Sequence, residues 1–268
     1  MEGTEGNEEN GMGIHVLAIG DIVGDKGLQH LTRVLPAFRR FQKIDFVIAN
    51  GENAAGLGLL PRQVEEMQTA GVDVITMGNH TWAKEQIFPM LDQMDCLIRP
   101  ANASPRMPGH GVCVCERHGV RIGVINLIGR CNMDFGPDNP FSLADQLIKQ
   151  MDVDLIFVDF HAEATSEKLA MAYYLDGRVT AVWGTHTHVP TADERIFPKG
   201  TGYITDLGMT GPVESVLGIR PNQSITTFLG GIPGRYTVAS GPCKMEGCLF
   251  VADPETGLCE QVERVSLL

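Results

Sequence analysis

The sequence predicts an α/β fold, and three observations support this prediction. Short apolar runs, typical of buried strands, alternate with segments of helical spacing over the first two thirds of the 268-residue chain. This alternation favours parallel strands joined by crossover helices. Polar side chains follow several of the apolar runs directly, and open α/β sheets bind their ligands at the carboxyl ends of the strands. The length is enough for one large domain with a substantial core.

The first half of the chain predicts three strands, each followed by a helix. In chain order these are a strand at 14–19, a helix at about 27–42, a strand at 46–49, a helix near 61–70, a strand at 72–77 and a helix at 83–93. Pro36 is expected to kink or divide its helix, because proline cannot donate the helical hydrogen bond. Pro61 suits the first turn of the next helix.

The second half continues the alternation and then becomes richer in glycine and turns. Its predicted elements are an extended piece at 98–102, a hairpin of 111–116 and 120–127, a helix at 142–151, a strand at 153–160, a helix at 164–176 and a strand at 179–183. Further β structure is expected at 236–240 and 248–252. Whether the loop over 129–140, with Phe135, covers a site is not decided by the sequence. No repeat and no linker divides the chain.

Composition limits the classes of function. Residues 1–12 predict a disordered acidic tail and residues 13–268 a single domain. No apolar segment at the N-terminus resembles a signal peptide, and no apolar run reaches 18 residues, so we expect no membrane partner. The net charge of −12 argues against tight binding of nucleic-acid backbone, so we expect no DNA partner and leave RNA open.

Cysteine usage favours a cytoplasmic protein. The seven cysteines are odd in number and contain no Cys-x-x-Cys pair, which is typical of free thiols rather than of a disulfide framework. The composition is compatible with a homo-oligomer, although no apolar stripe marks an interface.

Five polar clusters follow the apolar runs and supply the residues of a metal site. They are Gly20-Asp21, Gly51-Glu52-Asn53, Gly78-Asn79-His80, Phe160-His161-Ala162-Glu163 and Gly184-Thr185-His186-Thr187-His188. The candidate ligands among them are Asp21, Glu52, Asn53, Asn79, His161, His186 and His188. Seven ligands exceed the needs of one tetrahedral ion and suit two ions that share a carboxylate. Oxygen and nitrogen ligands without thiolate favour iron, manganese, zinc or related ions over a structural Cys-rich zinc site.

Some of these residues have simpler explanations when taken alone. Asp21 after a strand is also a candidate helix N-cap, and Asn53 a candidate turn residue. His161 is also a candidate for a partly buried imidazole with no metal. His186 and His188 are a stronger signal, because residues i and i+2 of an extended chain face the same side.

The remaining polar and aromatic groups receive less specific roles. The glycine-rich loop over 51–58 lacks the Gly-Lys-Ser/Thr ending of a phosphate loop. Trp82 is expected in the core, with base stacking as the alternative. Candidates to orient the ligating imidazoles are Glu163, Thr185 and Asp206. Ordinary surface or core histidines are expected at His15, His30, His110 and His118.

Together the motifs resemble, in order and approximate spacing, those of the calcineurin-like metallophosphoesterases. The longer strings that contain Asp21, Asn53, His161 and Asp206 resemble the bacterial YmdB-like branch, and the resemblance covers about residues 14–265. It implies a layered α/β/β/α sandwich with a metal site at the carboxyl ends of the strands. It also implies a metal-dependent phosphodiesterase that hydrolyses small phosphodiesters, with 2′,3′-cyclic nucleotides among the substrates.

The resemblance assigns a role to each candidate residue. It places one ion on Asp21, Glu52, Asn53 and His188, and a second ion on Glu52, Asn79, His161 and His186. Glu52 bridges the two ions, which are iron or manganese in the first instance and zinc or magnesium as alternatives. His80 is the general acid. Two departures from the superfamily pattern are Val23 in place of a ligating histidine and Glu52 in place of an aspartate.

The chemistry expected from this arrangement is in-line attack on phosphorus by a hydroxide that bridges the two ions. His80 would protonate the leaving oxygen. Two enzymatic alternatives use the same site, a phosphomonoesterase and a nuclease. A third alternative is a regulatory protein whose metal site is mainly structural.

Overall fold

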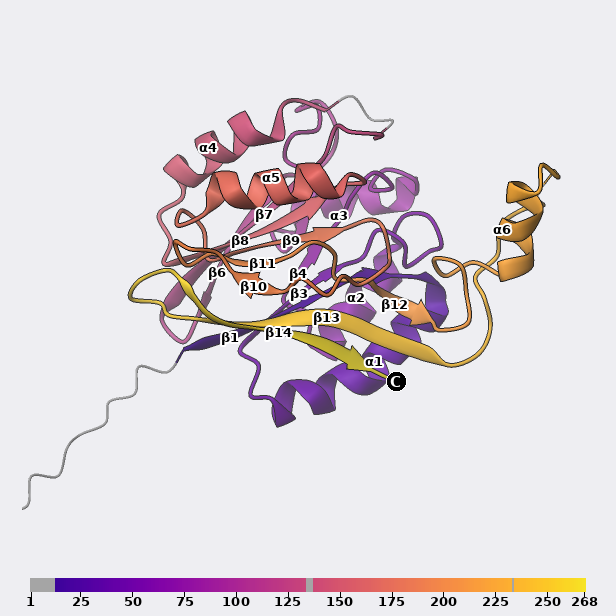
Figure 1. Cartoon of the computed structure of the whole chain (residues 1–268), viewed down its shortest axis with the longest axis horizontal. Helices are drawn as coiled ribbons and strands as arrows, with labels where there is room; N and C mark the ends of the chain where they lie inside the picture. Colours follow the sequence, from indigo (N-terminus) through magenta and orange to yellow (C-terminus); the bar gives the residue numbers. More distant parts are fainter. Residues whose placement is uncertain (1–12, 134–136, 233) are drawn as a thin grey trace, which may run out of the picture.

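The computed structural model describes residues 13–133, 137–232 and 234–268. The tail predicted over 1–12 and the residue Phe135 lie outside this part of the chain. The described residues form two packed sheets with helices on both outer faces (Figure 1). None of their helices is both long and apolar enough to cross a membrane.

The first sheet has a parallel centre with antiparallel strands added from the C-terminal third. Its order is β2 (Asp21–Ile22), β12 (Met209–Pro212), β13 (Cys243–Ala252), β1 (Ile14–Ile19), β3 (Phe46–Asn50), β4 (Val74–Thr76) and β5 (Leu97–Ile98), with β14 (Cys259–Leu267) paired to β13. Strands β1, β3, β4 and β5 are parallel, whereas β13 runs antiparallel to β1. The βαβ prediction is therefore correct for the centre of this sheet.

The second sheet is parallel except at its two edges. Its order is β10 (Arg195–Ile196), β11 (Gly202–Ile204), β9 (Ala181–Thr185), β8 (Leu155–His161), β7 (Val120–Ile128) and β6 (Val112–Arg117). Strands β7, β8, β9 and β11 are parallel, and β6 and β10 pair antiparallel at the edges. The predicted hairpin of 111–116 and 120–127 corresponds to β6 and β7.

Within the described parts of the chain, five α-helices cover the outer faces and one stands apart. The first sheet carries α1 (Gly24–Phe41), α2 (Pro61–Ala70) and α3 (Phe88–Gln93), the last preceded by a 3₁₀ turn at Glu85–Ile87, and the second sheet carries α4 (Pro140–Gln150) and α5 (Thr165–Leu175). Helix α6 (Pro221–Phe228) projects from the body on an arm (Figure 1).

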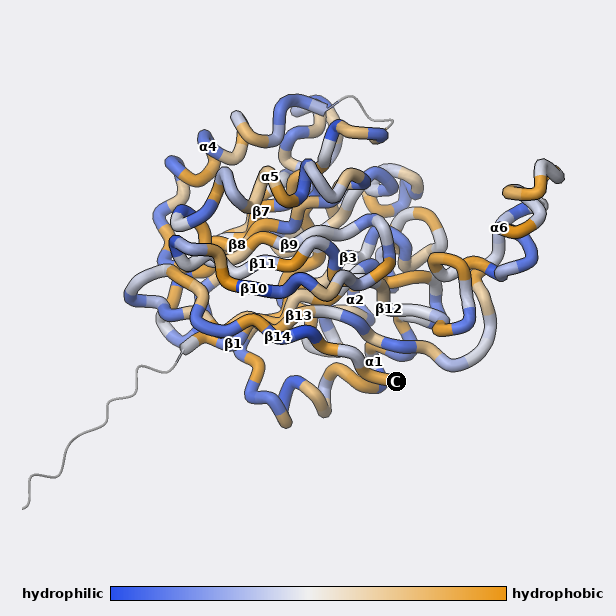
Figure 2. The backbone as a smooth tube through the Cα atoms, viewed as in Figure 1, coloured by the Kyte–Doolittle hydropathy of each residue, from blue (hydrophilic) through white to orange (hydrophobic). Residues whose placement is uncertain are grey.

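Alternation of side chains along the strands builds the layers. In β1, Leu17 and Ile19 pack on the helix side, while Val16 and Ala18 face the second sheet, where Trp183 is buried. Apolar residues concentrate in the strands of both sheets, as Figure 2 shows. The result is the predicted α/β/β/α sandwich, with one apolar layer between the sheets and one under each set of helices.

Three local predictions need correction. Helix α1 is not divided at Pro36, because Leu28, Leu31 and Leu35 anchor one face of it against the sheet. No strand forms over 236–240, where only an isolated bridge joins Val238 to the chain at Ile219. Helix α6 was not predicted, since it is only eight residues long; Ile225 and Phe228 have helical spacing within it, but none of its residues is buried.

Candidate metal centre

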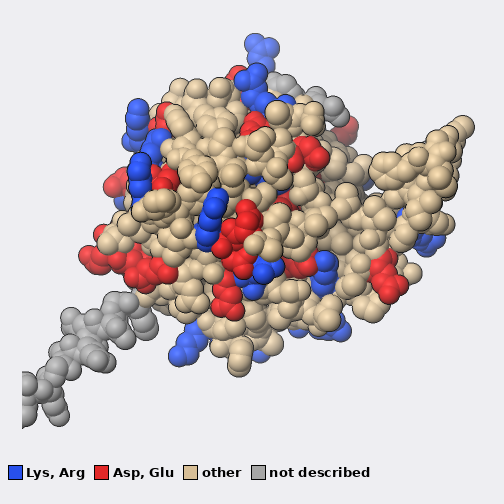
Figure 3. All heavy atoms as spheres, in the orientation of Figure 1, with Lys and Arg blue, Asp and Glu red and all other residues tan. Residues whose placement is uncertain are grey.

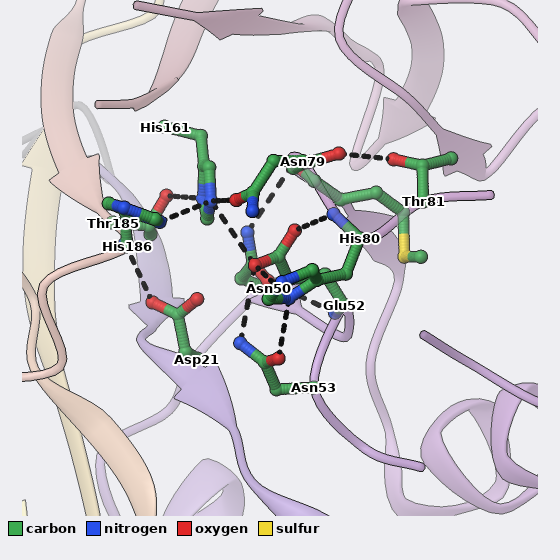
Figure 4. A network of polar contacts seen from close by, with 12 residues as sticks. Asp21, Asn50, Glu52, Asn53, Asn79, His80, Thr81, His161, Thr185 and His186 are labelled. Carbon is green, nitrogen blue, oxygen red and sulfur yellow. Dashed lines mark hydrogen bonds and ion pairs between the residues drawn. The ribbon is translucent and has the colours of Figure 1, made fainter. Parts of the chain in front are cut away.

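The carboxyl ends of strands from both sheets meet at one rim, and the seven predicted ligands lie there. Figure 4 labels all of them except His188. Asp21 opens β2, directly after β1, and His161 is the last residue of β8. The other five follow the ends of β3, β4 and β9: Glu52, Asn53, Asn79, His186 and His188. Asp21 is not the N-cap of α1, because that position is held by Val23.

Three of the candidate ligands converge on a ring nitrogen of a fourth, His161. Nε2 of His161 lies 3.2 Å from Oε1 of Glu52 and 3.1 Å from Nδ1 of His186. Oδ1 of Asn79 lies 2.9 Å from the same nitrogen. One ligand atom each from Glu52, His161 and His186 falls within 4.8 Å of the others. A single nitrogen cannot serve three partners, whereas a cation among these atoms can accept their lone pairs. This is the group predicted for the second ion.

The group predicted for the first ion lies beside it. Nε2 of His188 is 3.7 Å from Oδ1 of Asp21 and 3.2 Å from Nδ2 of Asn53. The same amide nitrogen donates to Oε1 of Glu52 at 3.2 Å. Asn53 therefore presents its nitrogen, not its oxygen, to the candidate ligands. Coordination through its oxygen requires the amide to rotate.

Asp21 supplies an independent test of whether this group suits a cation. Its side chain is fully buried, and Oδ1 has no hydrogen-bond partner among the described residues. The other oxygen accepts the backbone N–H of His186 at 3.0 Å. An unpaired carboxylate oxygen is costly in the interior, and a bound cation is the usual partner for such an oxygen. The residues therefore fit a metal.

The charges of the cluster respond to burial and to one another. Burial alone would raise the pKa of Glu52, but His161 and His80 outweigh it and hold that pKa well below its usual range. Burial lowers the pKa of His161, yet the Glu52 and Asp21 carboxylates raise it to about 9. Burial and the neighbouring His161 lower the pKa of His186 to about 3. A proton on His161 thus balances part of the negative charge of these carboxylates.

A buried chain of hydrogen bonds fixes the orientation of His161. Its Nδ1 lies 2.9 Å from Oγ1 of Thr185, which donates to Oδ1 of Asp159 at 2.7 Å. Since that hydroxyl proton is used, Nδ1–H of His161 donates, and the lone pair of Nε2 becomes available to the site when the second ring proton leaves. Burial raises the pKa of Asp159 to about 6. Thr185 was predicted as an orienting residue, but Asp159 was missed. Its signal was a lone carboxylate in an apolar strand.

Of the other two residues predicted to orient an imidazole, one contacts such a ring and the other does not. Oε2 of Glu163 lies 3.2 Å from Nε2 of His186, so it contacts the imidazole of a candidate ligand as expected. Asp206 bonds to no imidazole of the described chain; instead, it accepts the hydroxyl and the backbone N–H of Thr187, at 2.7 and 3.3 Å. Thr187 separates the two histidines, so Asp206 acts on the loop rather than on a ring.

The prediction that His186 and His188 face the same side because they lie on an extended chain was wrong in its reason. Both residues have positive φ, 95° and 62°, in the left-handed region that side chains rarely adopt. Strand β9 ends at Thr185, so the alternation of an extended strand does not reach either histidine. They share the site because the backbone turns there.

His80 lies next to the ligands without joining their cluster. Its backbone N–H donates to Oε2 of Glu52 at 2.9 Å, and its Nδ1 lies 2.9 Å from Oδ1 of Asn53. The side chain is 31% exposed and lines a cavity of about 300 Å³ together with Val23 and the rim histidines. A Cβ at Gly78 would collide with His161 and Glu52, which explains the glycine before Asn79 and His80. Trp82 packs against the core and does not line this cavity.

Comparison with known proteins decides the family. A profile of the YmdB-like protein family matches residues 17–265. The chain belongs to the YmdB-like family. It is 46% identical over 257 residues to a Bacillus subtilis (strain 168) protein named 2′,3′-cyclic-nucleotide 2′-phosphodiesterase, and the match covers 94% of this chain and 96% of that protein. The predicted family is thereby confirmed.

Two solved structures related to this YmdB-like chain share its fold. A structure from Mycoplasma pneumoniae, described as a novel phosphatase, has a TM-score of 0.90 at 37% identity, and the match covers 95% of this chain and 93% of the other. A hypothetical protein from Thermus thermophilus has a TM-score of 0.89 at 39% identity, with 94% and 98% coverage. The metallophosphoesterase fold predicted for the chain is confirmed.

Proposed function

We propose that this protein hydrolyses small phosphodiesters, with 2′,3′-cyclic nucleotides as the substrate class. The chain is a hydrolase of phosphoester bonds by family, and its B. subtilis relative is named for a cyclic-nucleotide phosphodiesterase activity. The observation that carries the proposal is the convergence of oxygen and nitrogen ligands around the unpaired Oδ1 of Asp21, beside a partly exposed His80.

The ligand set supports two divalent or iron-type ions, with iron or manganese preferred. Oxygen and imidazole ligands without thiolate suit these metals. One ion would be held by Asp21, Glu52, Asn53 and His188, and the other by Glu52, Asn79, His161 and His186. When bound, such ions lower the pKa of a water molecule and neutralise charge on phosphoryl oxygens.

His80 is suited to protonate the leaving oxygen. Its backbone N–H donates to Oε2 of Glu52 at 2.9 Å, which holds the residue beside the candidate ligands, and in this structure its Nδ1 faces Oδ1 of Asn53, so that the other ring nitrogen is left for the substrate. The ring borders the cavity that also contains Glu52 and His186, so a phosphoester held there lies within its reach. A histidine that is not a ligand but is held this firmly beside the ligands favours catalysis over a structural metal site.

The test combines metal analysis with a substrate screen. Freshly purified protein is expected to contain about two transition-metal ions per chain, and to hydrolyse adenosine 2′,3′-cyclic phosphate faster than adenosine monophosphates or RNA. Asp21→Ala should lose metal and turnover together, whereas Asp152→Ala, at a side chain that is 95% exposed, serves as the matched control. Preferential hydrolysis of monophosphates would point to a phosphomonoesterase. A protein that unfolds on chelation and hydrolyses no phosphoester would refute the proposal.

A further inference from the structure

A second cavity adjoins the candidate metal centre. It measures about 470 Å³, and Gly56 lines both cavities. Consecutive residues also line the two: Val23 and Ile219 face the metal-centre cavity, and the residues that follow them, Gly24 and Arg220, face the second. A ligand whose reacting group lies at the metal centre can therefore extend directly into this space.

The second cavity is cationic in a protein that is strongly acidic. Four basic side chains line it, against the single carboxylate of Asp25. That carboxylate is already engaged, since Arg62 donates to it at 2.7 Å. The remaining three cations have no side-chain hydrogen bond or ion pair within the described parts of the chain: Lys26, Lys84 and Arg220. The net charge of the chain is −12, and carboxylates are spread over the face seen in Figure 3, so the balance of charge at this cavity is opposite to that of the chain as a whole.

The three cations come from separate elements around the cavity. Lys26 lies in the first turn of α1, Lys84 precedes the 3₁₀ turn, and Arg220 is the N-cap residue of α6. Ala55 and Gly56 form a wall of small residues between them, where a ligand can approach the backbone closely. Lysine and arginine at such a wall are the groups that bind a phosphodiester in nucleic-acid complexes.

An aromatic side chain completes the cavity. Tyr236 is 48% exposed and lines the space beside Arg220. Its hydroxyl lies 2.8 Å from Oγ1 of Thr227 in α6, which restrains the ring. Exposed aromatic rings next to cationic grooves stack on nucleobases, and this stacking depends little on which base is present.

We propose that this cavity is a subsite for a second nucleotide, so that the preferred substrates are short oligonucleotides ending in a 2′,3′-cyclic phosphate. The proposal rests on the proposed function and names its substrate class more narrowly. The cyclic phosphate lies at the metal centre. The phosphate on the 5′ side of the terminal nucleoside contacts the cations Lys84 and Arg220, and the preceding base stacks on Tyr236.

The experiment compares adenosine 2′,3′-cyclic phosphate with the dinucleotide ApA ending in the same group. The wild type should show a kcat/KM about tenfold higher for the dinucleotide, as expected for a gained charge-assisted contact. The double variant K84Q/R220Q should lose most of this preference. A matched variant, K149Q/K199Q, removes two exposed lysines that line neither cavity and should retain the preference. The single substitution Arg220→Glu should reverse the preference.

Binding of products separates this inference from the proposed function. Titration of metal-loaded protein with ApA 3′-phosphate and with adenosine 3′-phosphate needs no turnover, and the dinucleotide should bind about tenfold more tightly. If neither cyclic substrate is hydrolysed, the proposed function fails, and the binding comparison decides the subsite. Equal affinity for the two products in the wild type, or an undiminished preference in K84Q/R220Q, would overturn the inference.

Discussion

At the residue scale, the unpaired oxygen of Asp21 links folding to metal binding. The carboxylate is fully buried, and burial raises its pKa. Asp21→Asn removes the buried charge and keeps an oxygen for the backbone N–H of His186. We expect the metal-free variant to be more stable than metal-free wild type by about 1–3 kcal/mol and to bind metal more weakly.

Urea unfolding of chelator-treated protein measures this effect. Asp152→Asn changes a carboxylate that is 95% exposed and is the control for the loss of one charge. A metal-free Asp21→Asn protein that is less stable than wild type would show that the carboxylate is satisfied without a cation.

His80 carries the second residue-scale prediction. His80→Ala should retain metal, because the ring is not part of the ligand cluster. It should lower kcat by about 10²–10⁴-fold for substrates with a ribose leaving group and much less for a nitrophenyl ester, which departs without a proton. Steady-state kinetics on both substrates and metal analysis check this prediction. His110→Ala, away from the site cavity, is the control; equal losses on the two substrates would count against the acid role.

The candidate ligands could be predicted because each follows an apolar run closely. The parts that could not be predicted depend on three-dimensional packing. The orientation of the Asn53 amide, with its nitrogen toward the candidate ligands, follows from its contact with His80. The hydrogen bond through which Asp159 orients His161 depends on the position of Thr185 on the next strand. Neither contact leaves a pattern in sequence spacing.

At the element scale, strands with strong apolar runs could be predicted and marginal elements could not. The parallel strand β1 falls at its predicted bounds, and β3, β8 and β9 lie within about two residues of theirs, because burial on both faces requires continuous apolar runs. Helix α6 is eight residues long and buries none of them, so the helical spacing of Ile225 and Phe228 is too short a pattern to predict a helix.

The turn after β9 depends on a buried ion pair. Nζ of Lys168 lies 2.7 Å from Oδ2 of Asp206, and both side chains are 1% exposed. Asp206 in turn holds Thr187, between the two histidines of left-handed backbone. The contacts from Lys168 in α5 through Asp206 to Thr187 thus hold the strained loop of residues 186–188 in place.

Lys168→Met should therefore destabilise the protein by about 3–5 kcal/mol, because it leaves the Asp206 carboxylate buried without its cation. Adding Asp206→Asn removes that charge and should restore most of the lost stability. Chemical denaturation of the single and double variants tests this coupling. Equal stability of Lys168→Met and wild type would show that water or the loop compensates for the charge.

At the scale of the whole molecule, stability and metal binding share a dependence on pH. The pKa of His161 rises from 6.5 to about 9 in the metal-free protein, so its contribution to stability is complete below about pH 6.5 and is lost as the pH rises through about 9. Metal requires the neutral ring and must displace that proton, so affinity should rise over the same range.

We therefore expect the increase in Tm on metal loading to grow between pH 6.5 and pH 9, the interval bounded by the two pKa values of His161. Thermal unfolding with and without metal at several pH values measures it. Calorimetry in buffers of different ionisation enthalpy should show that binding of the two metal ions near pH 7 releases about one proton per protein chain. An increase in Tm that is the same at both pH values would argue against a protonated His161 in the metal-free state.

The pairing of β13 with β1 has a consequence for biosynthesis. Strand β13, at Cys243–Ala252, lies between β12 and β1 and so borders the segment that leads into Asp21. While residue 252 is still inside the ribosomal tunnel, β1 has an open edge and its sheet is incomplete. Strand β1, which leads into Asp21, therefore gains its second neighbour only after residues 243–252 have emerged, so a C-terminal segment completes the sheet around an N-terminal candidate ligand.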